Sequence, residues 1–169
     1  IPNIDSGFFP GILKTARFGY DGKGQVQIGE KNELLRNLKD LTTSQYILEK
    51  KVPLDTELSI IIVRDKDGNI ASYPLAENRH ENGILAESVM PANVSVDVHK
   101  LAFTYGEKIA KQLNYVGVLT VEFFLNNGKL LFNEMAPRPH NSGHQTINAS
   151  VTSQFEQQVR ICASLPIGD

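Results

Sequence analysis

Residues 133–144, Asn-Glu-Met-Ala-Pro-Arg-Pro-His-Asn-Ser-Gly-His, constrain the fold of this 169-residue chain more than any other stretch. They follow an apolar, strand-like run that extends from Val118 to Phe132. Pro137 and Pro139 each lack a backbone N–H donor and have a fixed φ, so the segment can continue neither as a central strand nor as a helix. It nevertheless contains a carboxylate, a guanidinium, two imidazoles and two amides. A polar loop that only caps a sheet needs none of these groups, so we interpret the segment as a functional loop.

The composition is that of a soluble globular protein, with 41% hydrophobic and 21% charged residues. A formal net charge of -2 and the lack of a basic stripe in the sequence argue against a nucleic-acid partner. No apolar run approaches the ~20 residues that a membrane span needs, so we expect no membrane partner. The single cysteine, Cys162, forms no internal disulfide, which favours a reducing, cytoplasmic location. Its apolar helical neighbours predict that it is a buried small hydrophobe.

A glycine-rich loop, residues 17–25, follows the first short strand, which ends near Lys14. Three glycines stand within six positions of this loop: Gly19, Gly22 and Gly24. Such spacing permits positive φ and lets backbone N–H groups turn toward an anion, and Lys14 and Lys23 would add positive charge. The spacing matches neither the Walker A nor the Rossmann pattern. From these residues alone, a structural hairpin tip and a phosphate-binding loop both stay open.

Hydrophobic periodicity divides the rest of the chain into helices and short strands. Helical spacing predicts helices over 30–41, 95–113 and 152–165, the last with Thr152 or Ser153 as N-cap and Glu156 completing a capping box. Branched apolar runs and turn residues predict strands over 26–28, 46–52, 57–63, 70–73, 116–124 and 129–134. Pro53 after an extended run marks a boundary, so we place a hinge at Glu49–Val52 between residues 1–48 and residues 53–169.

Some residues with chemical potential receive structural interpretations from their neighbours. His80 lies in the polar stretch 78–83, which reads as a surface loop more readily than as site lining. His99 falls within a predicted helix, and we assign it no role. The segment 65–68, Asp-Lys-Asp-Gly, lacks the full calcium-loop pattern and is interpreted as a turn.

The hairpin around Asn126-Asn127-Gly128 determines whether two carboxylates meet. A two-residue turn at Asn127-Gly128 would put Glu122 and Glu134 on opposite faces, whereas a three-residue loop with Gly128 in a bulge puts them on one face, roughly 5–8 Å apart. At that separation they repel each other unless a cation lies between them, and magnesium is commonly bound by one or two carboxylates together with substrate phosphates. The run around Glu122 is too apolar for a solvent-facing pair, so we predict a magnesium site.

Together these pieces resemble the ATP-grasp superfamily, in which one lobe carries a glycine-rich phosphate loop and the other carries paired magnesium carboxylates. More closely, residues 19–25, 133–144 and 152–156 and the terminal Leu165-Pro-Ile-Gly resemble the signatures of the 5-(carboxyamino)imidazole ribonucleotide synthase family. The resemblance covers essentially the whole chain. It implies an α+β fold with two lobes, each built from an antiparallel β-sheet and helices.

The resemblance also implies an activity and roles for individual residues. Bicarbonate would attack the γ-phosphate of ATP to give carboxyphosphate, which would carboxylate 5-aminoimidazole ribonucleotide in purine biosynthesis. The residues implied to bind ATP are Lys14, Gly19, Tyr20, Asp21, Gly22, Lys23, Gly24, Gln25, Glu49, Lys50, Lys51, Val52, Glu57 and His80. Glu122 and Glu134 would bind magnesium with Asn133 beside them, and the residues implied to face the substrates are Tyr20, Asp21, Arg138, His140, Asn141 and His144.

The family normally has an N-terminal α/β domain before residue 1 and a small β-rich domain after residue 169, and the full enzyme is expected to be a homodimer. We therefore expect this chain to be the ATP-binding fragment of such an enzyme. Two alternatives stay open. One is another ATP-grasp ligase or carboxylase, which would not be expected to carry residues 137–144. The other is a nucleotide-binding module that is inactive on its own.

Overall fold

The structure is a computed structural model that describes residues 4–17, 19, 23–38 and 45–169. The chain forms two compact units: residues 1–53 together with 81–84, and residues 54–80 together with 85–169. The boundary follows Pro53, and the predicted hinge residues Glu49 and Lys50 belong to the last strand of the first unit. Within the described ranges, no helix is both long enough and apolar enough to span a bilayer.

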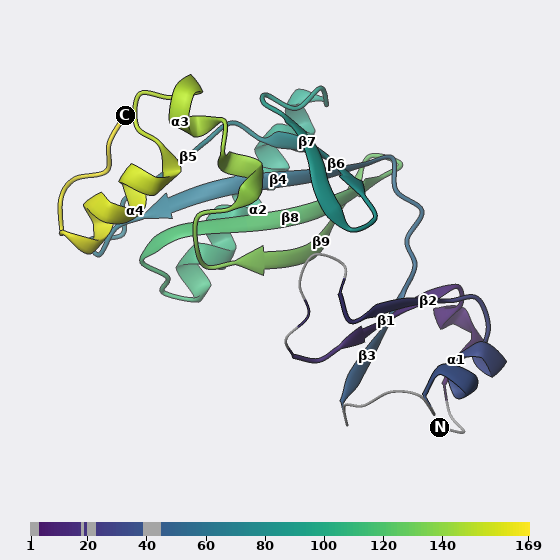
Figure 1. Ribbon diagram of the computed structural model, residues 1–169. Coiled ribbons are helices and arrows are strands. Elements are labelled where there is room, and N and C mark those ends of the chain that lie inside the picture. Colours follow the sequence, from purple (N-terminus) through teal and green to yellow (C-terminus); the bar gives the residue numbers. More distant parts are fainter. Residues whose placement is uncertain (1–3, 18, 20–22, 39–44) are drawn as a thin grey trace. The chain divides into compact units, whose positions relative to one another are not determined.

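The first unit is a three-stranded antiparallel sheet in the order β2-β1-β3, packed against one short helix (Figure 1). Its elements are η1 (Ser6–Phe8), β1 (Gly11–Thr15), β2 (Gln25–Ile28), α1 (Lys31–Asn37) and β3 (Tyr46–Lys50). Leu13, Ile28 and Leu34 form its buried core, one from each of two strands and one from the helix. The predicted helix over 30–41 is confirmed for Lys31–Asn37, and residues 39–41 lie outside the described ranges.

The second unit is a six-stranded sheet in which β7-β6-β4-β8-β9 are neighbours and β5 also pairs with β4. Its strands are β4 (Thr56–Arg64), β5 (Ile70–Ser72), β6 (Ala76–Glu81), β7 (Ile84–Val89), β8 (Gly117–Asn126) and β9 (Lys129–Ala136). Its helices are α2 (Val96–Gln112), η2 (Asn141–Gly143), α3 (Thr146–Ala149) and α4 (Gln154–Cys162). Two antiparallel sheets with helices confirm the predicted fold class.

Helices cover the two faces of the larger sheet because apolar side chains of β4 and β8 alternate between them. One face packs against α2, with a core that includes Leu58, Ile60, Leu119, Val121 and Phe123. The other face packs against α4, with a core that includes Ile61, Val63, Val118 and Ile161. The central strands are therefore buried on both sides, which explains their nearly continuous apolar sequences.

Helix boundaries follow the capping residues. The hydroxyl of Ser95 accepts a hydrogen bond from the Val98 N–H at the start of α2, and the hydroxyl of Ser153 accepts one from the Glu156 N–H at the start of α4. Both predicted helices are thereby confirmed. Cys162, however, is exposed at the end of α4, so the prediction of a buried cysteine is wrong. The neighbouring residue, Ile161, is buried instead and packs in the core between α4 and the sheet.

The hairpin between β8 and β9 differs from the prediction. Asn127 and Gly128 have positive φ values of 48° and 75° and form a two-residue turn between the paired residues Asn126 and Lys129. This geometry is the one that Asn-Gly favours in tight hairpins. The three-residue loop predicted from the sequence is therefore wrong.

An irregularity within β9 nevertheless compensates for the shorter turn. The pairs on either side of it are Phe123–Phe132 and Val121–Met135. Glu122 is thus opposed by two residues, Asn133 and Glu134, which is the arrangement of a β-bulge. The extra residue reverses the alternation of β9, so Glu134 returns to the face that Glu122 occupies. The shared face predicted for the two carboxylates arises from a bulge within the strand and not from the loop.

Two polar segments interpreted from the sequence as non-regular structure, residues 78–83 and 65–68, differ in the structure. Residues 78–81 form the end of β6, so the interpretation of 78–83 as a loop is wrong for most of its length. The segment 65–68 is a turn, as predicted, in which the Asp65 carboxylate accepts hydrogen bonds from the backbone N–H groups of Asp67 and Asn69.

We expect Ile62→Ala to lower the free energy of unfolding of the second unit by about 2–5 kcal/mol, because Ile62 is completely buried against α2. The matched control is Ile147→Ala on α3, where the side chain is 56% exposed and the change should be within about 0.5 kcal/mol. Chemical denaturation monitored by circular dichroism measures both. Equal losses for the two variants would contradict the core assignment.

Candidate active site

A group of polar side chains lies on the face of the six-stranded sheet opposite α2. Along β4, Leu58 points to the α2 core, so Glu57 and Ser59 point to the other face. The strand register places Glu122 of β8 opposite Ser59, and Asn78 of β6 opposite Glu57. Three neighbouring strands therefore bring polar groups together on one face, and the predicted site residues Glu57 and Glu122 are among them.

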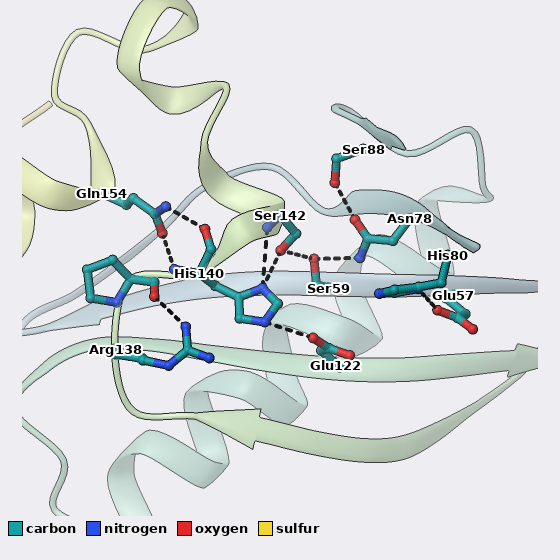
Figure 2. Close-up of polar contacts among 11 residues, drawn as sticks. Glu57, Ser59, Asn78, His80, Ser88, Glu122, Arg138, His140, Ser142 and Gln154 are labelled. Carbon is teal, nitrogen blue, oxygen red and sulfur yellow. Dashed lines mark hydrogen bonds and ion pairs between the residues drawn. The ribbon is translucent and has the colours of Figure 1, made fainter. Parts of the chain in front are cut away.

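Two histidines each pair with a carboxylate on this face. His140 Nε2 lies 3.0 Å from Glu122 Oε1, and both side chains are nearly buried, with exposed fractions of 12% and 13%. His80 Nδ1 pairs with Glu57 Oε2, and these two side chains are also largely shielded from solvent. Figure 2 shows both pairs on the same side of the strands. The sequence interpretation of His80 as a surface-loop residue is wrong, whereas the role implied by the family resemblance is compatible with this position.

Electrostatics links the two pairs. The hydrogen bond from His80 to Glu57 raises the pKa of His80 above its usual 6.5, against the lowering effect of burial. The negative charges of Glu57, Glu122 and Glu134 raise this pKa further. Glu134 therefore lies close enough to His80 to act on it, as does Glu122. This face of the sheet thus carries three carboxylates, Glu57, Glu122 and Glu134, which favour a positively charged group near them.

The carboxylates fit the magnesium site predicted from the sequence. The bulge in β9 sets Asn133 and Glu134 opposite Glu122, so carboxylate oxygens from two strands share one face. Within the described part of the chain, no group of three or more His, Cys, Asp or Glu side chains is arranged to bind a metal ion by itself. Two carboxylates are nevertheless the usual protein contribution to a magnesium ion that also contacts substrate phosphates.

The loop after β9 presents its polar side chains in different directions. His140 turns inward to Glu122, while Arg138 is exposed and its Nη1 donates a hydrogen bond to the carbonyl oxygen of Pro139 at 2.9 Å (Figure 2). Asn141 is also exposed. His144 is exposed and stacks on Phe155 of α4, with 6.0 Å between the ring centroids. The structure therefore brings His140 to the carboxylates and leaves Arg138, Asn141 and His144 accessible to a ligand.

The first unit carries the remaining predicted residues. Lys14 Nζ forms an ion pair of 2.6 Å with Glu49 Oε2 across β1 and β3. Lys51 Nζ donates to Gln27 Oε1 at 3.0 Å, and its backbone N–H donates to the carbonyl oxygen of Pro10. The predicted residues Gly19, Lys23, Gln25, Lys50 and Val52 are described in this unit, whereas Tyr20, Asp21 and Gly22 lie outside the described residues.

Gly24 shows why the loop needs glycine at that position. Its φ is +77°, and a Cβ there would lie 2.6 Å from the hydroxyl of Thr15. The carbonyl oxygen of Gly24 accepts a hydrogen bond from the Thr15 N–H, which closes the strand pair. This glycine therefore has a structural requirement of its own, and phosphate binding by the loop stays a prediction.

Sequence reasoning missed several buried polar residues around His140. They are Ser59, Asn78, Ser142 and Gln154, all at most 5% exposed. One signal was available: Glu57 and Ser59 are polar at alternating positions of an otherwise apolar strand, which indicates a polar patch on one face. Ser142 and Gln154 gave no comparable signal, because polar residues are ordinary in a loop and at a helix start.

The raised pKa of His80 predicts a pH dependence. Because the folded protein binds this proton more tightly than the unfolded chain, the stabilisation is complete below pH 6.5 and is lost as the pH rises through the raised pKa of His80. We expect Glu57→Gln to lower the pKa of His80 and to reduce this loss. An NMR titration of the histidine ring protons measures the pKa, and denaturation at several pH values measures the stability.

The control is Glu87→Gln, which removes an exposed carboxylate that pairs with Arg79 on the neighbouring strand. It should leave the pKa of His80 unchanged. A pKa of His80 that responds equally to both variants would show that general charge, and not the Glu57 contact, sets its value.

Comparison with known proteins places this arrangement in a family. The sequence profile of the ATP-grasp domain matches residues 4–155. The N5-carboxyaminoimidazole ribonucleotide synthase of Bacillus subtilis (strain 168) is 48% identical over 160 residues, which cover 94% of this chain and 42% of that protein.

Solved structures agree. The crystal structure of N5-carboxyaminoimidazole ribonucleotide synthetase from Thermus thermophilus superposes with a TM-score of 0.87 at 46% identity, covering 95% of this chain and 43% of that one. The Aspergillus clavatus N5-carboxyaminoimidazole synthase, in complex with ADP and 5-aminoimidazole ribonucleotide, gives a TM-score of 0.85 at 31% identity, covering 95% and 42%. This chain thus spans less than half the length of these relatives. The ATP-grasp profile matches most of the sequence, and the fold agrees with that of the solved relatives. The chain therefore belongs to the ATP-grasp family.

Proposed function

We propose that this chain is the ATP-binding part of an N5-carboxyaminoimidazole ribonucleotide synthase, an ATP-dependent carbon–nitrogen ligase of purine biosynthesis. The observation that carries the proposal is the bulged strand β9, which sets Glu134 opposite Glu122 and leads directly into the loop with Arg138 and His140. The 48% identity to the synthase of Bacillus subtilis over 160 residues supports the same proposal. The relatives' purine-pathway names support a cytoplasmic location for this chain as well.

The proposed reaction has two steps. Bicarbonate oxygen attacks the γ-phosphorus of ATP, and ADP leaves with the electron pair of the broken bond, giving carboxyphosphate. The amine of 5-aminoimidazole ribonucleotide then attacks the carboxyl carbon, phosphate leaves, and the amine proton is lost to a base. The relative that was crystallised with ADP and 5-aminoimidazole ribonucleotide supports this choice of substrates.

The side chains of the second unit suit this chemistry. Phosphoryl transfer depends on positioning and charge neutralisation more than on covalent help, and magnesium bound to Glu122 and Glu134 would neutralise phosphate charge. The exposed guanidinium of Arg138 can make a planar, two-pronged contact with bicarbonate or carboxyphosphate. Asn141 and His144, also exposed, are proposed to contact the substrates, and Glu57 and His80 the ribose side of the nucleotide.

Residues of the first unit are proposed to bind the phosphates and the adenine. Lys14 and the loop of residues 19–25 would supply positive charge and backbone N–H donors. Tyr20 and Asp21 are also proposed to contact the substrates. Residues 49–52 would meet the adenine through backbone groups. The rest of the ribonucleotide site, and a homodimer interface, are proposed to come from segments that the longer relatives have and this chain does not span.

The direct test is titration calorimetry of MgATP into this chain, followed by an assay of ATP turnover. Turnover that rises above the bicarbonate-only background when 5-aminoimidazole ribonucleotide is added supports the proposal. MgATP binding without such turnover favours the alternative of a nucleotide-binding module that is inactive alone. Turnover that responds to a different amine or carboxylate favours another ATP-grasp ligase.

We expect Glu134→Gln to weaken magnesium-dependent nucleotide binding by about 10- to 100-fold, since a neutral amide replaces a charged ligand. Circular dichroism should show an intact fold, because the side chain is exposed. Calorimetry with and without magnesium measures the effect. An unchanged magnesium dependence would refute the metal assignment.

Arg138→Lys should reduce bicarbonate-dependent ATP turnover by about 10- to 100-fold and leave the dissociation constant for MgATP within about twofold. Lysine keeps the charge but cannot make the planar two-pronged contact. Parallel loss of turnover and of ATP binding would place Arg138 against the ATP phosphates instead of bicarbonate.

A further inference from the structure

A continuous row of hydrogen bonds, two of them fully buried, leads from β7 to the His140 ring that pairs with Glu122 (Figure 2). It starts at β7, where Ser88 Oγ donates to Asn78 Oδ1 of β6. Asn78 Nδ2 donates to Ser59 Oγ of β4 at 2.9 Å, and Ser59 Oγ donates to Ser142 Oγ of η2 at 2.7 Å. The row reaches the imidazole of His140, whose Nδ1 lies 3.0 Å from Ser142 Oγ. We call Ser88, Asn78, Ser59 and Ser142 the serine–asparagine row.

The hydrogen-bond directions in this row determine the tautomer of His140. An amide nitrogen can only donate, so Ser59 accepts the hydrogen bond from Asn78 and keeps its hydroxyl proton for another partner. In the structure it donates that proton to Ser142. Ser142 then has its hydroxyl proton available for His140 Nδ1. The backbone N–H of Ser142, which also can only donate, points at the same nitrogen at 3.3 Å. Two donors therefore meet at Nδ1, which must accept, and the ring proton resides on Nε2.

The proton on Nε2 points at Glu122. Nε2 lies 3.0 Å from Glu122 Oε1, so the ring donates and that carboxylate oxygen accepts. Both ring nitrogens of His140 are thus engaged inside the protein. Neither is available to accept a proton from a substrate.

Gln154 fixes the backbone of the same histidine. Its side chain is completely buried, its Oε1 accepts from the His140 N–H at 2.9 Å, and its Nε2 donates to the His140 carbonyl oxygen at 2.6 Å. Gly143 packs so closely that a Cβ there would lie 2.6 Å from Gln154 Oε1. Gln154 therefore holds the backbone of His140 in place, while the contacts at its two ring nitrogens hold the ring toward Glu122.

We infer that Ser59, Asn78, Ser142 and Gln154 are positioning residues that hold His140 as the neutral Nε2–H tautomer and thereby fix the orientation of the Glu122 carboxylate. His140 is then itself a positioning residue, in contrast to the substrate-facing role implied by the family resemblance. Hydrogen-bonded neighbours commonly orient the carboxylates that bind a metal ion. The consequence for cation binding rests on the proposed function, whereas the tautomer of His140 does not.

The test is long-range ¹H–¹⁵N correlation NMR on metal-free protein labelled with ¹⁵N-histidine, with His140 assigned by its loss in His140→Gln. The expected spectrum shows a protonated Nε2 and an unprotonated Nδ1. Ser142→Ala and Ser59→Ala should each shift the tautomer ratio toward Nδ1–H on the order of fivefold, the effect of one ordinary hydrogen bond. Ser59 is decisive because its hydroxyl hydrogen-bonds with Asn78 and Ser142 and is thus one step removed from the His140 ring.

The matched control is Ser72→Ala, an exposed serine on β5 of the same sheet, which should leave the His140 signals unchanged. Should Ser59→Ala fail to fold, Ser88→Ala at the half-buried end of the row replaces it and should shift the ratio in the same direction. An Nδ1–H tautomer in the unmodified protein overturns the inference. So does a ratio that no serine variant in the row changes.

Binding of Mn²⁺ to the ADP-loaded chain, followed by electron paramagnetic resonance, tests the consequence for Glu122. Ser59→Ala should weaken Mn²⁺ binding by about fivefold and leave ADP binding without the cation unchanged. A shifted tautomer with unchanged Mn²⁺ affinity overturns the link to Glu122. The expected tautomer in a chain that binds neither Mn²⁺ nor ADP supports the positioning of His140 and overturns the proposed function instead.

Discussion

The antiparallel pairing of β4 with β8 is the interaction on which the rest of the second unit depends. It runs without a break from Thr56–Leu125 to Arg64–Gly117. Because this register is regular, each strand presents alternate residues to each face, and α2 and α4 find apolar surfaces on opposite sides. The same register sets Ser59 opposite Glu122. The strand pair that forms the core therefore also fixes where the polar site begins.

The bulge in β9 is the departure from regularity that matters for function. A regular strand after the two-residue Asn127-Gly128 turn would direct Glu134 away from Glu122. One extra residue restores the shared face and delivers the chain into the loop that carries Arg138 and His140. Bringing carboxylates together costs electrostatic repulsion. The hydrogen bond to Glu57 first, and then the negative charges of Glu57, Glu122 and Glu134, raise the pKa of His80 beside them. A bound cation would relieve that repulsion and would also offset the negative charge of a phosphate-bearing ligand, which connects this local distortion to the proposed chemistry.

Two histidines on this face serve different physical purposes. His80 faces three carboxylates and gains affinity for a proton from them. His140 is bound at both ring nitrogens and at both backbone groups, so its surroundings fix its orientation. Arg138 and His144, by contrast, remain exposed and suited to contact a ligand. The site thus combines a buried part around His140 with an exposed part around Arg138 and His144. The sequence of residues 133–144 does not reveal this division, because polar residues are spread evenly along it.

The sequence by itself determined the fold class, the long helices and most strands, because periodicity, caps and turn residues are local signals, but it did not predict β6 and β7. The Pro-Arg-Pro-His loop nominated candidate site residues, whose roles stay predictions. The sequence predicted that Glu122 and Glu134 share a face, but it derived this from a three-residue loop that the structure does not have. The bulge that actually brings them to one face lies within a strand and leaves no local pattern in the sequence. Tertiary structure alone decided that His80 lies in a strand beside Glu57, that Cys162 is exposed, and that Ser59 and Gln154 support His140. The supporting contacts join residues 14 to 83 positions apart, where side-chain packing and hydrogen-bond geometry, and not local propensity, select the partner.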